Sequence, residues 1–128
     1  MIKLIDFEYC NFIKYSEEVN RFNKEIENGK ISYGSICQFE INKRYVNFSH
    51  IIKRLEIIGN SIYGDVEFLD NDKGKLCKEI IKYGGYFIPI YYNSEIIGFD
   101  VYIDYNSEDF FEMIKINKRN EKIEKLIN

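Results

Sequence analysis

Apolar residues recur at helical spacing in three stretches of the chain, separated by stretches in which apolar and polar residues alternate. The helical spacing predicts helices over residues 16–30, 71–85 and 107–128. Ser16 is a candidate N-cap of the first helix, because a serine hydroxyl can accept from the free backbone N–H groups there. Gly29 is a candidate stop for the same helix.

The alternating stretches predict strands, since side chains of a strand point to opposite faces of a sheet. Gly59 and Asn60 separate two such stretches and predict a hairpin turn. Pro89 removes one backbone donor, so its strand is expected at a sheet edge or a bulge. The predicted strands cover residues 1–9, 31–41, 45–58, 61–70, 86–92 and 95–105.

The predicted elements follow in the order strand, helix, three strands, helix, two strands, helix. Because strands mostly follow strands, the order favours an α+β protein over a parallel sheet of strand–helix–strand units. We expect mostly antiparallel strands that curl into a small β-barrel flanked by helices. A chain of 128 residues is expected to form one domain.

Composition and charge remove several classes of function. The net charge is -3, from 18 basic and 21 acidic residues, whereas a general nucleic-acid binder is usually basic. No apolar run approaches the length of a membrane helix. The three cysteines Cys10, Cys37 and Cys77 form no closely spaced pair, and with no signal peptide evident we expect a reducing compartment. Eleven tyrosines suggest a contact surface, because tyrosine combines a packing ring with a polar tip.

Candidate catalytic residues are few. His50 is the one histidine, and it lies in an apolar strand pattern that favours a buried residue bonded to its neighbours over a general base. Cys37 and Cys77 fall on apolar faces, which favours core packing over reactivity. One histidine and three scattered cysteines do not supply the short ligand spacings of a zinc site.

Acidic residues crowd the region before the second predicted helix, at Asp65, Glu67, Asp70 and Asp72. Paired carboxylates of a glycosidase are conceivable there, but a helix N-terminus favours acidic residues in any case. The sequence "NDKGK" lacks the form of a phosphate-binding loop. We therefore expect no bound cofactor and no metal.

The stretch "VNFSHIIKRLEIIGNSIYGDVEFLDNDKGKLCKEIIKYGGYF" resembles the middle of the tailed-phage prohead proteases. That family has a "V-S-H-x-I" strand, a hairpin with two spaced glycines, an "L-D-T-P-x-G" segment, a helix and a further strand. The residues that fall in register with this pattern are Gly34, Ser49, His50, Ile52, Gly59, Gly64, Leu69, Asp70, Gly74 and Gly84.

The flanking segments are also similar to that family, so the resemblance covers about residues 11–113. It implies a prohead-protease-like domain over residues 1–113, built as a small β-barrel ringed by helices, as in the herpesvirus assemblins. Residues 114–128 would then form the end of the C-terminal helix or a basic tail.

The resemblance implies loss of the catalytic pair. Gln38 occupies the position of the family's histidine, and Ile90 and Tyr91 occupy its serine positions. Glutamine does not take a proton near neutral pH, and isoleucine has no nucleophilic atom. His50 matches a family residue that we interpret as structural. We therefore expect no enzymatic activity.

The resulting hypothesis is a non-enzymatic virion structural protein, used as a capsid, head-decoration or head-to-tail component. Its partners would be capsid, scaffold or other virion proteins in a multi-copy assembly, with no membrane and no specific nucleic acid. It would reside in the virion, and in the host cytoplasm during assembly. One alternative is an active maturation protease that recruits His50 with Ser49 or Cys37. Another is an inactive subunit that regulates such a protease.

Overall fold

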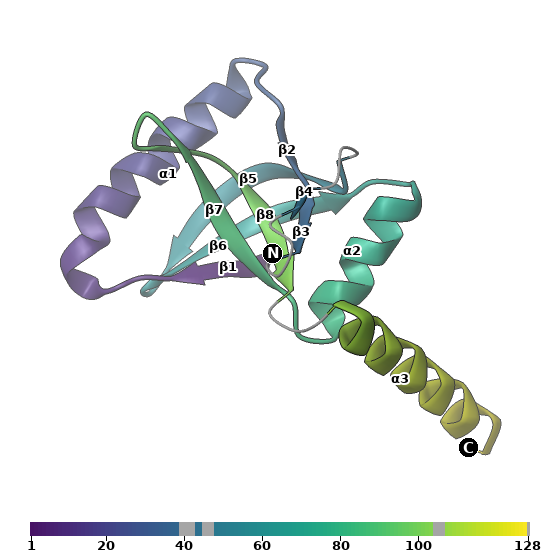
Figure 1. Cartoon of the computed structure of the whole chain (residues 1–128). Coiled ribbons are helices and arrows are strands. Elements are labelled where there is room, and N and C mark those ends of the chain that lie inside the picture. The colour runs from purple at the N-terminus through teal and green to yellow at the C-terminus, as the bar shows by residue number, and fades with distance from the viewer. Residues whose placement is uncertain (39–42, 45–47, 104–106, 128) are drawn as a thin grey trace.

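A computed structural model of the chain describes residues 1–38, 43–44, 48–103 and 107–127. In these ranges the protein is α+β, with three α-helices, one 3-10 turn and two four-stranded sheets (Figure 1). The elements are β1 (Ile2–Asp6), η1 (Tyr9–Asn11), α1 (Phe12–Glu27), β2 (Ser32–Gly34), β3 (Ile36–Gln38), β4 (Lys43–Arg44), β5 (His50–Ile58), β6 (Ser61–Phe68), α2 (Asp72–Lys82), β7 (Tyr86–Tyr92), β8 (Glu95–Ile103) and α3 (Ser107–Ile127).

The strands form two sheets with the orders β1-β6-β5-β2 and β4-β3-β8-β7. All recorded pairs are antiparallel except β3 with β8. The expectation of one small β-barrel is not confirmed, because neither sheet closes on itself among the described residues. The predicted antiparallel α+β class is confirmed.

The chain passes from the first sheet to the second at Ser35, and this corrects the single strand expected over residues 31–41. β2 pairs with β5, whereas β3 pairs with β8. Ser35 between them is fully buried, and its backbone N–H donates to Asp100 Oδ1 at 2.9 Å. Its carbonyl accepts from Val101 N at 3.0 Å, so the crossover is tied to β8. Residues 39–41 of the expected strand lie outside the described ranges.

Several predicted boundaries are right and others are wrong. The β5–β6 hairpin turns at Gly59 with φ +62°, and β7, which contains Pro89, is an edge strand. Helix α1 begins at Phe12, so the predicted cap at Ser16 is wrong; a 3-10 turn leads directly into the helix four residues earlier. β5 begins at His50, not at residue 45, and residues 45–47 are not described.

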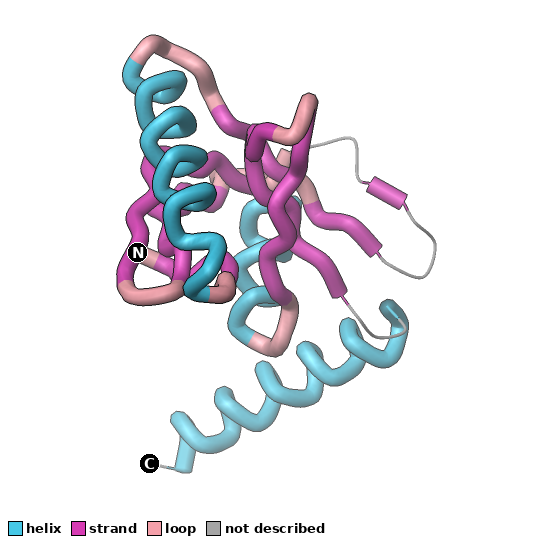
Figure 2. The backbone as a smooth tube through the Cα atoms, turned by 90° about the vertical axis from the view of Figure 1, so that its left-hand side faces the viewer, coloured by secondary structure: helices cyan, strands magenta, loops and turns pink. Residues whose placement is uncertain are grey.

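Helix α1 covers one side of the strands and supplies hydrogen bonds that the sheets lack there (Figure 2). The β5–β6 register shifts between Ile52 and Arg54, and Asn23 donates to Leu55 O and accepts from Leu55 N, both at 2.9 Å. Near the start of β8, Arg21 donates to Ile96 O at 2.7 Å. A buried irregular strand is tolerated because side chains satisfy its peptide groups.

The apolar core lies between the sheets and beneath the helices. Phe22 of α1, Ile80 of α2 and Ile114 of α3 each contribute a buried side chain, so every helix is anchored in the same core. The strands contribute the remainder, including Ile36, Ile52, Leu55, Ile62, Phe99 and Val101. Among the described residues, this core encloses a cluster of polar side chains at the start of β5.

Candidate functional site

Ser49, His50 and Cys77, whose side chain types can act in catalysis, meet inside the fold at the start of β5. Ser49 Oγ lies 2.8 Å from His50 Nδ1, and His50 Nε2 lies 2.7 Å from the carbonyl oxygen of Phe99 on β8. The imidazole also makes an edge contact with the Phe87 ring, at 5.7 Å between centroids. The histidine therefore bridges the two sheets, and nearby the Ser32 hydroxyl of β2 also donates across to Ile97 O of β8 at 2.8 Å.

The two contacts define the protonation of the ring. A carbonyl oxygen can only accept, so Nε2 carries the proton and donates to Phe99. Nδ1 of a neutral ring is then an acceptor, and the Ser49 hydroxyl donates to it at 2.8 Å in preference to Gly34 O, which lies 3.4 Å away. Burial lowers the pKa of His50, although the Phe99 carbonyl and the charge of Asp100 act in the opposite direction. The ring is neutral at neutral pH.

Two cysteines and one carboxylate complete the cluster. Cys77 Sγ of α2 lies 3.7 Å from His50 Nδ1, and burial raises the pKa of this thiol to about 11. Cys37 Sγ donates to Asp100 Oδ2 at 3.3 Å. Reactive cysteines need a lowered pKa and access, so Cys77 is an inert thiol. The predicted buried positions of Cys37 and Cys77 are confirmed.

The cluster is closed to solvent. Ser49, His50 and Cys77 are each 0% exposed. Gly34 closes it from β2: a Cβ at this position would lie 2.1 Å from His50 Nε2 and 2.3 Å from the Phe99 carbonyl oxygen. A substrate carbonyl cannot approach either the serine or the imidazole in this arrangement, although the Ser–His hydrogen bond alone has the length of a nucleophile–base contact.

Half of the residues of the prohead-protease pattern lie at or beside this cluster: Gly34, Ser49, His50, Leu69 and Gly74. Ser49 N donates to Gly34 O at 2.9 Å, and Leu69 N donates to Ser49 O at 3.0 Å. Gly74, in the first turn of α2, lies so close to Leu69 that a Cβ would be 1.8 Å from the Leu69 carbonyl oxygen. These five residues come from β2, from the start of β5 and from the segment that leads into α2, and they form one interlocked unit. Their close packing accounts for both glycines.

The other residues of the pattern have separate structural roles. Gly59 and Gly84 adopt positive φ, +62° at the hairpin and +115° after α2, where L side chains are strained. Gly64 packs beneath Leu4, and a Cβ added at this position would lie only 2.6 Å from Leu4 Cδ1. Asp70 is exposed, just before Asn71, whose side chain caps α2 by accepting from Gly74 N at 2.7 Å.

The positions matched to the family's catalytic pair lie apart. Gln38 pairs with Ile103 near the end of β8, whereas Ile90 pairs with Gly98 near its start. Five residues of strand separate these two partners, or roughly 17 Å at about 3.3 Å per residue. Gln38 and Ile90 also flank β8 on opposite sides. The backbone therefore does not bring these two positions together as a dyad.

Tyr91, the other matched serine position, is an exposed residue of the edge strand β7. Burial of its hydroxyl and a hydrogen bond with Tyr15 of α1 raise the pKa of Tyr91 to about 12. The side chain is therefore a neutral phenol that contacts the helix.

An apolar surface on the outer face of β2 and β5 was missed by sequence reasoning. Tyr33 is paired with Ile51 across the strands, and its ring stacks on Phe48 with 4.6 Å between centroids. Tyr33, Phe48 and Ile31 are 40%, 41% and 56% exposed. We call the set Ile26, Ile31, Tyr33, Phe48 and Ile51 the outer apolar surface. The alternation of residues 31–33 and 51–53 was the available signal, since one face had to be outward.

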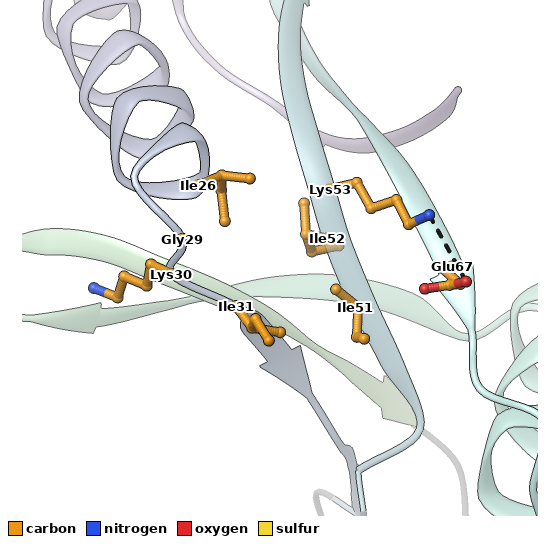
Figure 3. Close-up of a pocket in the computed structure, with 8 residues that line it drawn as sticks. All are labelled: Ile26, Gly29, Lys30, Ile31, Ile51, Ile52, Lys53 and Glu67. Carbon is orange, nitrogen blue, oxygen red and sulfur yellow. Dashed lines mark ion pairs between the residues drawn. The ribbon is translucent and has the colours of Figure 1, made fainter.

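A groove of about 300 Å³ runs along this surface between the end of α1 and β5 (Figure 3). Ile26, Ile31 and Ile51 line it, and Lys53 forms an ion pair with Glu67 at its rim, at 3.7 Å. An apolar floor with a charged rim is the composition of a protein contact surface. The buried Ile52 also lines the groove, whereas His50 does not.

Metal ligands and paired carboxylates are the remaining candidates among the described residues. Across residues 1–38, 43–44, 48–103 and 107–127, no group of three or more His, Cys, Asp and Glu is placed to hold a metal ion. The acidic residues considered as paired carboxylates lie on the surface: Asp72 is in the first turn of α2, and Asp65 and Glu67 are exposed on β6. None of the helices in the described part combines the length and hydropathy of a membrane span.

Comparison of the chain with protein-family models, with curated proteins and with solved structures gave no significant match.

Proposed function

We propose that the protein is a non-enzymatic structural component of a tailed-phage particle, of the capsid, head-decoration or head-to-tail kind, built on a prohead-protease-like fold. The observation that carries the non-enzymatic part is the burial of the Ser49–His50 pair. A hydrolase needs its nucleophile exposed to substrate, and this serine and imidazole instead join two sheets in the core.

The phage assignment rests on the pattern of residues shared with the prohead proteases. Support comes from the way in which Gly34, Ser49, His50, Leu69 and Gly74 interlock, because a pattern kept for packing should be contiguous in space. We propose that the two sheets correspond to the small barrel of that family, opened between β1 and β7. These edge strands lie in contact without a recorded hydrogen-bonded ladder, and the β2–β3 crossover joins the sheets on the other side.

The proposal does not require that Gln38 and Ile90 descend from a catalytic pair. Their separation along β8 gives no support to that part of the resemblance. What the proposal requires is a surface for assembly, and the outer apolar surface with its groove is suited to a protein partner. Capsid, scaffold or other virion proteins are the proposed partners, met first in the host cytoplasm and then in the particle.

A second candidate is a maturation protease that uses His50 with Ser49 or Cys37. The 2.8 Å contact between Ser49 and His50 favours it, and the complete burial of both side chains opposes it. An inactive subunit that regulates a true protease is a third candidate, which would use the same outer surface and would co-purify with an active relative.

Two measurements test the proposal. Purified particles of the phage that carries this gene, analysed by mass spectrometry, should contain the protein in many copies; its absence from mature particles would remove the structural assignment. Independently, a serine-directed activity probe should label neither the purified protein nor its Ser49→Ala variant. Labelling of the wild type that disappears in both Ser49→Ala and His50→Ala would establish the protease instead.

A further inference from the structure

Helix α3 presents two different faces, and only one of them is covered. Towards the body, Ile114 is buried, Lys118 pairs with Glu79 at 3.2 Å, and Glu121 accepts from the Tyr83 hydroxyl at 2.7 Å. In Figure 1 the helix continues from beside α2 away from the sheets. The side turned from the body carries the exposed side chains of Met113, Ile116 and Ile123.

The exposed apolar positions follow the repeat of a coiled coil. Met113, Ile116, Asn120 and Ile123 are spaced by three, four and three residues, which is the alternation of the core positions a and d in a heptad. This places Met113 and Asn120 at a, and Ile116 and Ile123 at d. A single asparagine at an a position is the usual means of fixing register and strand number in a parallel pair.

The charges that flank the stripe complement each other between two copies. Arg119 falls at position g and Glu124 at the following e, and these positions face each other across a parallel pair of helices. Within one helix the two residues are five apart, which turns them about 140° from each other, so they cannot pair internally. None of the ion pairs recorded among the described residues uses Arg119 or Glu124.

We propose that α3 pairs in parallel and in register with α3 of a second copy of this chain, through Met113, Ile116, Asn120 and Ile123. The face that holds the body lies roughly 140° around the helix from this stripe, so two bodies fit on opposite sides of the pair. The inference stands apart from the proposed phage function, because it rests on α3 alone.

The contact is small, and its strength follows from its size. The four stripe residues span fewer than two heptads, well below the surface that a permanent dimer buries. The pair should therefore form and separate with concentration in solution. In an assembly that holds many copies side by side, the effective concentration would make the same contact persistent.

The test is sedimentation of the full chain from about 10 μM to about 1 mM, at low salt. The wild type should shift from monomer to dimer across this range. Ile116→Lys with Ile123→Lys should abolish the shift, whereas Ile13→Lys, a change at an isoleucine of α1 that is even more exposed, should leave it in place. Asn120→Ile should strengthen association by about tenfold or more.

Charge reversal decides the parallel arrangement. Arg119→Glu alone and Glu124→Arg alone should each weaken association by about tenfold, since each places like charges together at two sites of the dimer. An equal mixture of the two variants should recover wild-type association, because both contacts become Glu–Arg again. A chain that stays monomeric at about 1 mM, a dimer indifferent to the stripe, or a mixture that fails to recover would overturn the proposal.

Discussion

The two faces of β5 carry opposite chemistry, although they belong to one short strand. His50 and Ile52 point inward and are fully buried, while Ile51 and Lys53 point outward along the groove. The inner face carries a histidine beside a serine, which are residue types that enzymes use in catalysis. The outer face carries an isoleucine and a lysine, which are residue types that can contact a protein partner. A serine and a histidine within hydrogen-bonding distance therefore do not make an active site when both side chains are buried and link two sheets.

The largest loss of stability is expected from adding one methyl group at Gly34, next to the inner face of β5. Gly34→Ala would place a Cβ 2.1 Å from His50 Nε2 and 2.3 Å from a backbone oxygen, so β2 must separate from β5 or β8. We expect the free energy of unfolding to fall by about 4 kcal/mol or more. Gly29→Ala is the control, with open space but φ +100°, and should cost only about 1–2 kcal/mol. Equal losses in urea denaturation would contradict the packing account.

A smaller but still large effect is expected from removing the bridging histidine. His50→Ala removes the ring that the Phe99 carbonyl and the Ser49 hydroxyl bond, leaves the hydroxyl only its longer contact with Gly34 O, and opens a cavity, so the free energy of unfolding should fall by about 3 kcal/mol. Ile51→Ala, the adjacent residue on the outer face, should cost about 1 kcal/mol or less. Denaturation curves of the two variants measure the difference between the faces, and a reversed order would refute it.

These faces also mark what the sequence could and could not predict. Period-two alternation correctly placed His50 inside, and the glycines at 59 and 84 correctly marked a turn and a helix end, because each of these signals is local. The crossover at Ser35 was not predictable, because it depends on Asp100, which is 65 residues away. Alternation marks which residues of β2 face outward, but the way in which α1, β2 and β5 meet to form the outer apolar surface depends on tertiary packing.

The site was predicted in type but not in arrangement. Burial of His50, Cys37 and Cys77 followed from their apolar neighbours in sequence. That His50 contacts Ser49, Cys77 and the Phe99 carbonyl depends on how α2 and β8 pack on β5, which is tertiary information. The separation of Gln38 from Ile90 depends on the register of two strands along β8 and was likewise out of reach.

Stability should depend on pH through the inner face. Burial lowers the pKa of His50 from its ordinary value of 6.5, so the unfolded chain takes up a proton more readily than the folded one. Stability should be fully present above about pH 6.5 and should fall below it, by at most about 1.4 kcal/mol per pH unit. The protein has one histidine, so His50→Gln should flatten the slope between pH 5.5 and 6.5 in urea titrations. An unchanged slope in the variant would assign the effect to other groups.

The smallest change in stability is expected from the aromatic pair on the outer face. Tyr33 and Phe48 stack at 4.6 Å between centroids, and an aromatic pair contributes about 0.5–1.5 kcal/mol beyond its buried area. A double-mutant cycle of Tyr33→Ala and Phe48→Ala should therefore give a coupling energy of about 1 kcal/mol, and neither variant should alter the pH slope. A coupling near zero would mean that the two rings are placed for a partner alone.

The most direct test of the central claim is nuclear magnetic resonance of the single imidazole as a function of pH. The account predicts a neutral ring at neutral pH with the proton on Nε2, a slowly exchanging Hε2, and a pKa of His50 below the ordinary value of 6.5. A ring that titrates near 6.5 and exchanges its proton freely with water would contradict the account, because the serine and histidine would then be open to substrate.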